Sequence, residues 1–158
     1  MIANTIGGVY ALSNSEAYTV VSTGEDIGVY FTADAGETWT KQSAFNLTSA
    51  FANFVYFWNE NDGVTVGDPT DEGYFEIYTT SNGGNDWQRV PTTNIPQSES
   101  EYTFNGNTSF KLVDNILYFR TSKGRIFYTN DKGNTWDVID AEIQINSFAF
   151  KDELNGLV

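Results

Sequence analysis

The segment Thr129-Asn130-Asp131-Lys132-Gly133-Asn134-Thr135-Trp136 occurs in three related copies in this 158-residue chain. The earlier copies are Thr32-Ala33-Asp34-Ala35-Gly36-Glu37-Thr38-Trp39 and Thr80-Ser81-Asn82-Gly83-Gly84-Asn85-Asp86-Trp87. Their tryptophans stand at positions 39, 87 and 136, so the copies repeat at spacings of 48 and 49 residues. A fixed spacing of this size is typical of a repeat architecture. We name the copies box segments 1, 2 and 3 in chain order.

Each box segment contains the residue types of a tight hairpin turn. The Asp or Asn side chain can accept backbone N–H groups across the turn, and the glycine two positions later permits a positive φ. The tryptophan can anchor the following strand by burying a large ring. A side chain that bonds its own turn in every repeat is structural. We therefore predict a structural role for Thr32, Asp34, Gly36, Trp39, Thr80, Asn82, Gly84, Trp87, Thr129, Asp131, Gly133 and Trp136, and no catalytic residue among them.

Each repeat is predicted to contain four short strands. Runs rich in Tyr, Phe, Ile and Val precede the box segments, and further strands begin at the tryptophans. The stretch 57–64 matches 150–157 and marks the turn between the first two strands of a repeat. The predicted fold class is all-β: a β-propeller of four-stranded antiparallel blades, with about three blades and the start of a fourth. The expected blades are 5–43, 49–91 and 107–140, with the next one starting at 145–158.

A closed propeller has about four to eight blades. We therefore expect residues 1–158 to be a partial propeller, either part of a longer protein or completed by another chain. The remaining blades of the same propeller are thus one predicted partner.

Composition excludes several functions. The chain has 21 acidic and 8 basic residues, and a net charge of −13 disfavours a nucleic-acid partner and an anionic membrane surface. Without Cys or His, this segment can form no disulfide, Cys or His metal site, or Ser-His-Asp triad. No apolar run approaches the length of a spanning helix, so no membrane insertion is expected. Because no Gly-x-Gly-x-x-Gly follows a strand, no cofactor is predicted.

The box pattern resembles the Asp-box, or BNR repeat, of known β-propellers. The stretch 63–69, GVTVGDP, is followed by 74–80, YFEIYTT, box segment 2, and 87–91, WQRVP. Together they are similar to the Ycf48-like exported propellers, also called photosystem II stability/assembly-factor-like proteins. A glycine-containing family segment reads QSESEYTF here, at 97–104, without its glycines. The resemblance implies a non-catalytic binding or assembly module that is secreted, at the cell surface or periplasmic.

The Asn-, Phe- and Tyr-rich style is similar to that of Bacteroidota surface proteins, many of them exported by the type IX secretion route. A protein partner is implied, and a glycan is a further candidate ligand.

One end of the second repeat carries a group of carboxylates. In an antiparallel blade, the loops between strands two and three and between consecutive blades share the end opposite the box segments. In the second repeat these loops contain five acidic residues, which we name the acidic rim: Asp68, Asp71, Glu72, Glu99 and Glu101. The connection 92–107 exceeds the usual hairpin length. A solvated loop edge is the simpler interpretation, and a cation site or an acidic docking surface is the functional one.

Two functions remain open. The favoured one is the binding module, and the alternative is a sialidase-like or endoglucanase-like glycoside hydrolase whose catalytic residues lie largely in missing blades. A sialidase would need three arginines around its substrate. This chain has only Arg89, Arg120 and Arg125, and Arg89 is expected on the outer strand of a blade, a poor place for a central clamp. Glycoside hydrolysis needs two carboxylates about 5–10 Å apart, which the acidic rim could supply. A receptor propeller similar to sortilin is a third, less favoured possibility. Whether the chain is an enzyme is left open by the sequence.

Overall fold

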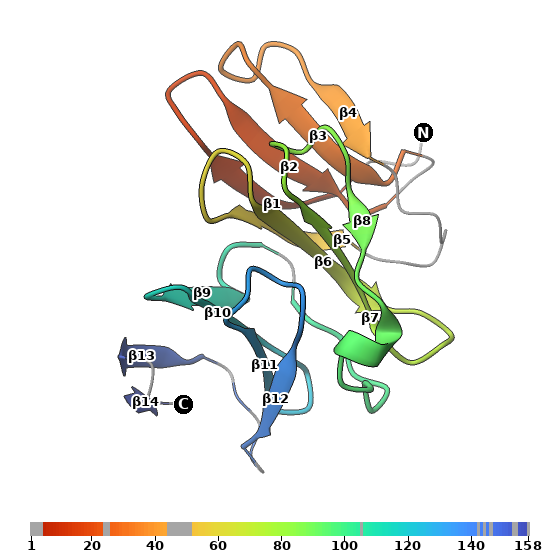
Figure 1. Cartoon of the computed structure of the whole chain (residues 1–158), viewed down its shortest axis with the longest axis vertical. Coiled ribbons are helices and arrows are strands. Elements are labelled where there is room, and N and C mark those ends of the chain that lie inside the picture. The colour runs from red at the N-terminus through yellow and green to blue at the C-terminus, as the bar shows by residue number, and fades with distance from the viewer. Residues whose placement is uncertain are drawn as a thin grey trace.

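The computed structural model describes residues 5–23, 26–43, 52–104, 106–141, 143, 145, 147–152 and 155–157. Within them lie three four-stranded antiparallel sheets and one two-stranded hairpin, with strands in chain order in each sheet. Figure 1 shows the sheets following one another in an arc, from β1–β4 to β13–β14. The predicted β-propeller of four-stranded antiparallel blades is confirmed. We name the three sheets blades 1, 2 and 3.

The strand bounds follow the repeat. Blade 1 contains β1 (Ile6–Ala11), β2 (Ala17–Val21), β3 (Gly28–Thr32) and β4 (Thr40–Ser43). Blade 2 contains β5 (Ala52–Phe57), β6 (Gly63–Pro69), β7 (Phe75–Thr80) and β8 (Gln88–Arg89), and a short 3-10 turn, η1 (Thr92–Asn94), follows it. Blade 3 contains β9 (Phe110–Val113), β10 (Ile116–Arg120), β11 (Arg125–Thr129) and β12 (Asp137–Asp140). The final hairpin is β13 (Ala149–Asp152) and β14 (Asn155–Leu157).

Two predicted strand starts differ from the structure. The last strand of each blade begins one residue after its tryptophan, and β13 begins at Ala149 where the sequence predicted Ile145. Ile145 is instead buried beside Tyr118, outside any strand. Residues 49–51, predicted to open the second blade, lie outside the described part of the chain.

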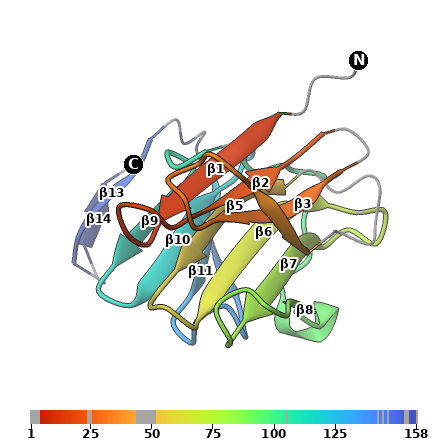
Figure 2. The same cartoon turned by 90° about the horizontal axis from the view of Figure 1, so that it is seen from above.

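The first strands of neighbouring blades lie side by side. β1 packs against β5, and β9 packs against β13. Close approach depends on Gly7, because a Cβ there would lie 2.5 Å from the Ala52 carbonyl oxygen. Asn107 Nδ2 also donates to the Val9 carbonyl oxygen at 2.8 Å, which joins the connection before β9 to β1. In both views β8 and η1 lie on the side of the molecule opposite the β13–β14 hairpin (Figures 1 and 2).

Aromatic interfaces between the blades form the core. Between blades 1 and 2 the Tyr18 ring stacks on Phe57, with centroids 4.3 Å apart. Between blades 2 and 3, Phe54 stacks on Phe110 at 4.6 Å, and Phe75 meets Phe127 edge-on at 5.0 Å. Burying one such side chain contributes about 1.5–3 kcal/mol. The blades are therefore held together through their faces.

Box segments 2 and 3 rest on the blade before them. A Cβ at Gly84 would lie 2.9 Å from the Tyr18 ring of blade 1, and one at Gly133 would lie 3.0 Å from Thr79 of blade 2. Both glycines have positive φ, at 77° and 85°, so turn conformation and close packing require the same residue. The Tyr18 hydroxyl donates to the Gly83 carbonyl oxygen at 2.5 Å.

The three box tryptophans differ in burial, although the sequence predicted that each would anchor its strand. Trp136 is 4% exposed, and its ring centroid lies 5.3 Å from that of Phe119. Its indole N–H donates to the Gly133 carbonyl oxygen at 3.0 Å. Trp87 is half-buried against Phe57, whereas Trp39 is 39% exposed. Burial of Trp39 was therefore wrongly expected. Within the described residues no blade precedes blade 1, so nothing covers its box segment as blades 1 and 2 cover the other two.

In the part of the chain that the structure describes, no helix has the length and apolar character needed to cross a membrane.

Candidate functional site

Box segments 1 and 3 form the same hydrogen-bonded turn. In box segment 1, Asp34 Oδ1 accepts the Thr38 N–H at 2.9 Å and the Thr32 hydroxyl at 2.7 Å. Its second oxygen, Oδ2, accepts the Thr38 hydroxyl at 2.5 Å. In box segment 3, Asp131 accepts the Thr135 N–H at 2.9 Å and the Thr135 hydroxyl at 2.6 Å. Both oxygens of each carboxylate thus accept hydrogen bonds from their own turn.

Box segment 2 forms this turn with different chemistry. Asn82 Oδ1 accepts the Asp86 N–H and the Thr80 hydroxyl, both at 3.0 Å. Its amide Nδ2 then donates to the Asp86 carboxylate at 2.9 Å. The second side-chain bond therefore runs in the opposite direction from its counterparts in the other two turns. The Gly84 N–H donates to the Thr80 hydroxyl oxygen at 3.0 Å, as the equivalent glycines do elsewhere.

The aspartates of box segments 1 and 3 are held ionised. Hydrogen bonds from the Thr38 hydroxyl, the Thr38 N–H and Thr32 lower the pKa of Asp34 to about 2. Burial acts to raise the pKa of Asp131, but hydrogen bonds from Thr135 and Thr129 outweigh it, and the net pKa lies below its usual range. A general acid needs the opposite shift. These carboxylates have the environment of structural acceptors.

Glu101, predicted as part of the acidic rim, is buried instead. Its side chain is 0% exposed and pairs with Arg125 Nη1 at 2.8 Å, and the Thr121 hydroxyl also donates to it. Arg125 is itself 9% exposed. The sequence could not indicate this, because the partners lie 20 and 24 residues further along the chain. Glu101 therefore holds the connection 92–107 against blade 3.

The other rim carboxylates have separate surroundings. Asp68 Oδ1 accepts the Asn53 amide at 2.9 Å and the Thr103 N–H at 3.0 Å, and burial raises the pKa of Asp68 despite these bonds. Glu72 pairs with Arg89 Nη2 at 3.2 Å. Asp71 and Glu99 are exposed. The predicted set is therefore not one cluster of equivalent acids.

Three rim residues nevertheless share one pocket. Asp71, Glu72 and Glu101 line a cavity of about 460 Å³ between the β6–β7 loop and the long connection, together with Pro69, Thr70, Gly73, Gln97, Ser98 and Ser100. We name this cavity the rim pocket. Asp68 and Glu99 do not line it. Among the residues that the structure describes, no group of three or more acidic side chains is arranged to hold a metal ion, so the cation hypothesis gains no support.

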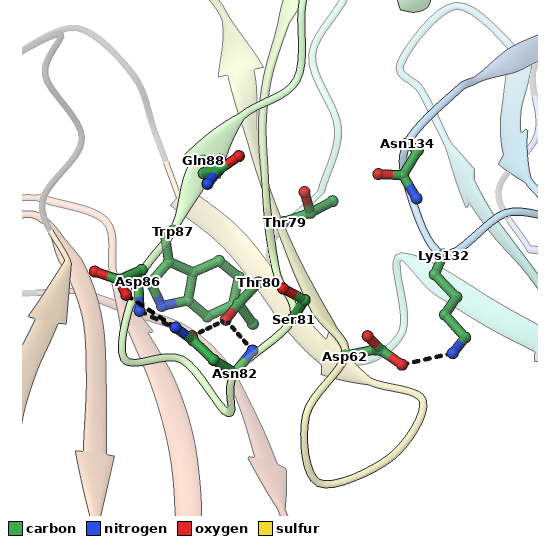
Figure 3. A pocket seen from close by; sticks show the side chains of 10 residues that line it. All are labelled: Asp62, Thr79, Thr80, Ser81, Asn82, Asp86, Trp87, Gln88, Lys132 and Asn134. Atoms are coloured by element: carbon green, nitrogen blue, oxygen red, sulfur yellow. Dashed lines mark hydrogen bonds and ion pairs between the residues drawn. The ribbon is translucent and has the colours of Figure 1, made fainter.

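A second pocket, which no sequence pattern indicated, lies at the opposite end, between blades 2 and 3 (Figure 3). It has a volume of about 430 Å³ and we name it the inter-blade pocket. Figure 3 shows Trp87, Thr80 and Asn82 on one side, with Lys132 and Asn134 facing them from box segment 3. Its remaining lining residues are Asp62, Thr79, Ser81, Asp86 and Gln88.

One ion pair joins the two blades at the inter-blade pocket. Lys132 Nζ lies 2.5 Å from Asp62 Oδ2. The hydrogen bond from Lys132 is the main cause that lowers the pKa of Asp62, with a smaller contribution from Asn59. Because residues 62 and 132 are 70 positions apart, sequence spacing does not predict this ion pair, which forms only when blades 2 and 3 pack together.

Comparisons with known proteins give the fold. No family model matches the chain, and no curated protein matches it. Among solved structures it is similar to YCF48 bound to D1 peptide, with a TM-score of 0.63 and 21% identity over 92% of this chain and 44% of that one. It is also similar to YCF48 from Cyanidioschyzon merolae, with a TM-score of 0.60 and 20% identity over 91% of this chain and 39% of that one.

A third similar structure is the GH74 enzyme of Niastella koreensis, with a TM-score of 0.58 and 16% identity over 90% of this chain and 22% of that one. The chain thus spans less than half the length of each of these three proteins. At these identities the likeness concerns the fold. The chain has a Ycf48-like β-propeller fold.

Proposed function

We propose that this chain is a non-catalytic binding module, and that its rim pocket docks a positively charged segment of a protein partner. The lining of the rim pocket is the observation that carries the proposal. Exposed Asp71 and Glu72 stand at the pocket, and hydroxyl groups of Ser98 and Ser100 supplement them. A lysine or arginine that enters meets the carboxylate of Asp71, together with Glu72, whose Oε2 is also paired with Arg89. The net charge of −13 favours its approach.

The backbone around the rim pocket supports a binding role. Ser100 has a φ of +58°, a conformation that is uncommon for a residue with a Cβ and often found at functional sites. Thr70 Oγ1 is buried and has no hydrogen-bond partner among the described residues. Ser98 bonds the Gly73 carbonyl oxygen through its N–H at 2.8 Å and its hydroxyl at 2.9 Å, which holds the connection against the β6–β7 loop. The pocket is therefore firmly shaped before a partner arrives.

A known complex supports a protein segment as the ligand. The similar structure of YCF48 is bound to D1 peptide. An exported location, at the cell surface or in the periplasm, belongs to the same proposal and rests on the sequence resemblance alone.

The three arginines do not favour the sialidase alternative. Arg89 pairs with Glu72 and with buried Glu76, and Arg125 pairs with Glu101. The Arg120 guanidinium stacks over the Phe104 ring at 3.8 Å. The arginines are thus engaged in separate contacts, and they do not converge on one pocket.

Peptide binding tests the proposal. A fluorescein-labelled decapeptide of alternating lysine and serine is titrated with the 158-residue chain, and fluorescence anisotropy gives the Kd. Replacing Asp71→Asn and Glu72→Gln together is expected to raise the Kd about fivefold, because each exposed pair contributes about 0.2–1 kcal/mol. Added salt is expected to weaken binding by screening.

A matched control separates the rim pocket from general attraction. Glu37→Gln with Asp137→Asn removes the same charge from exposed positions of box segment 1 and β12. These changes are expected to leave the Kd within about twofold of the unchanged chain, since they contact no bound peptide. Equal weakening by both pairs of variants contradicts docking at the rim pocket. Glycan hydrolysis that Asp68→Asn abolishes contradicts the non-catalytic role.

A further inference from the structure

The inter-blade pocket has no part in the proposed protein docking. It lies at the end of the blades that carries the box segments, whereas the rim pocket lies at the opposite end. Its volume of about 430 Å³ falls within the range of about 300–1,000 Å³ typical of small-molecule sites. The chemistry of its lining can therefore be considered separately.

Uncommitted hydroxyl and amide groups line one side of the inter-blade pocket. The side chains of Thr79, Ser81 and Gln88 form no hydrogen bond within the described residues, and each carries both a donor and an acceptor. Ser81 and Gln88 are exposed, and Thr79 is half-buried. A ligand whose own groups both donate and accept could bond to all three.

The charges at the inter-blade pocket disfavour an anionic ligand. Its one lysine, Lys132, is neutralised by Asp62 at 2.5 Å. Asp86 adds a second carboxylate, which accepts the Asn82 amide at 2.9 Å. An anion would be repelled by two carboxylates with one cation already paired. A neutral ligand avoids this repulsion and can use the carboxylate oxygens as acceptors.

One aromatic ring completes the lining. The half-buried indole of Trp87 lies beside Thr80 and Asn82 in Figure 3. The face of an indole is electron-rich and attracts the slightly positive C–H groups of a ligand. The pocket therefore combines hydroxyl, amide and carboxylate groups with one apolar surface.

The groove between blades 1 and 2 provides an internal comparison. It has a volume of about 390 Å³, and it is lined by Leu12, Ser13, Glu16, Tyr18, Phe31 and Glu60. Phe31 pairs with Tyr18 in blade 1 at the register position where Thr79 pairs with Val64 in blade 2. The change from Phe to Thr at this position is one of several differences between the two cavities, and it replaces an aromatic ring by a hydroxyl group.

We propose that the inter-blade pocket binds one or two units of a neutral saccharide. Each sugar hydroxyl both donates and accepts, which matches Thr79, Ser81 and Gln88. The C–H face of the sugar ring packs against Trp87. The groove between blades 1 and 2, with its two glutamates and aromatic lining, is expected not to bind the same ligand.

Nuclear magnetic resonance titration of the isotope-labelled 158-residue chain tests this. The probes are the methyl glycosides of glucose, galactose, mannose and N-acetylglucosamine, with cellobiose and chitobiose. At least one probe is expected to shift the backbone amides of Ser81 and Gln88 and the Trp87 indole N–H in a saturable way. Galacturonate is expected to bind at least about tenfold more weakly, because it carries a carboxylate.

Two variants locate the binding. Ser81→Ala with Gln88→Ala is expected to raise the Kd about tenfold through the loss of two hydrogen bonds. Thr79→Phe copies the Phe31 side chain of blade 1 and is expected to abolish binding by filling the pocket. Asp137→Ala is the matched control, since Asp137 pairs with Tyr128 at the register position where Gln88 pairs with Thr79 in blade 2.

Three results would overturn the proposal. They are no saturable shift with any neutral probe, shifts that centre on the rim pocket, and equal weakening by Asp137→Ala. Thermal melting of each variant shows whether it is folded. If Thr79→Phe does not fold, the double variant Ser81→Ala with Gln88→Ala alone shows whether the saccharide binds in the inter-blade pocket.

Discussion

Box segments 2 and 3 form the same type of turn, but one side-chain hydrogen bond runs in opposite directions in the two segments. In box segment 3 the carboxylate of Asp131 accepts from the Thr135 hydroxyl at 2.6 Å. In box segment 2 the amide of Asn82 donates to the Asp86 carboxylate at 2.9 Å. Asn82 is the donor where Asp131 is the acceptor, and Asp86 is the acceptor where Thr135 is the donor. The Asn in place of the Asp is therefore accompanied by an Asp in place of the Thr, and together they keep the second side-chain bond of the turn.

The same segments also differ in what covers them. Blade 2 lies under box segment 3 and buries Trp136, while Trp39 of box segment 1 is 39% exposed. Segments with the same sequence pattern are therefore expected to make unequal contributions to stability. The hydrogen bonds of a box segment are local, but the burial of its tryptophan depends on the neighbouring blade.

The largest expected effect concerns this burial. Trp136→Ala is expected to lower the free energy of unfolding by about 3–5 kcal/mol, because it leaves a cavity beside Phe119. Trp39→Ala removes a ring that is already 39% exposed and is expected to cost less, about 1 kcal/mol. Urea unfolding followed by circular dichroism measures both. Equal losses in the two variants would show that the coverage by the preceding blade does not determine the contribution.

A smaller effect is expected from reversing the polarity of box segment 2. Asn82→Asp places a carboxylate where the amide now bonds Asp86 and is expected to cost about 1–2 kcal/mol at pH 7. Adding Asp86→Thr rebuilds the arrangement of box segment 3 and is expected to restore most of the loss. Urea unfolding of the single and double variants gives the coupling energy. No rescue by the second change would contradict the exchange of donor and acceptor.

The smallest effect is expected from acid. The pKa of Asp34 is lowered to about 2 in the folded chain, and that of Asp131 is lowered as well. A carboxyl with a lowered folded pKa contributes stability above its unfolded pKa, about 4, and this contribution is lost as the pH falls towards the folded value. Melting temperatures between pH 5 and pH 2 measure the loss. Asp34→Asn is expected to flatten the slope, and an unchanged slope would contradict the assignment.

Much of the fold follows from the printed sequence, because its determinants are local. Trp39, Trp87 and Trp136 mark the repeat, and the runs rich in Tyr, Phe, Ile and Val predict the strands between them. The acidic rim was less predictable, because Glu101 is buried by its ion pair with Arg125 and its hydrogen bond from Thr121, both in the next blade. Spacing along the chain carries no information on such a pair. The inter-blade pocket was missed for the same physical reason, because Asp62 and Lys132 meet only across stacked blades.

The packing of box segments 2 and 3 on the blade before them gives assembly a direction. A ribosome releases the chain from its amino end, so Tyr18 and its sheet are complete before the Gly84 turn emerges, and Thr79 is in place before the Gly133 turn. Each of these two hairpins therefore meets a surface that has already been synthesised, and it need not wait for later sequence. Because Gly84 and Gly133 each pack against a residue that precedes them in the chain, the blades can fold in the order in which they are synthesised.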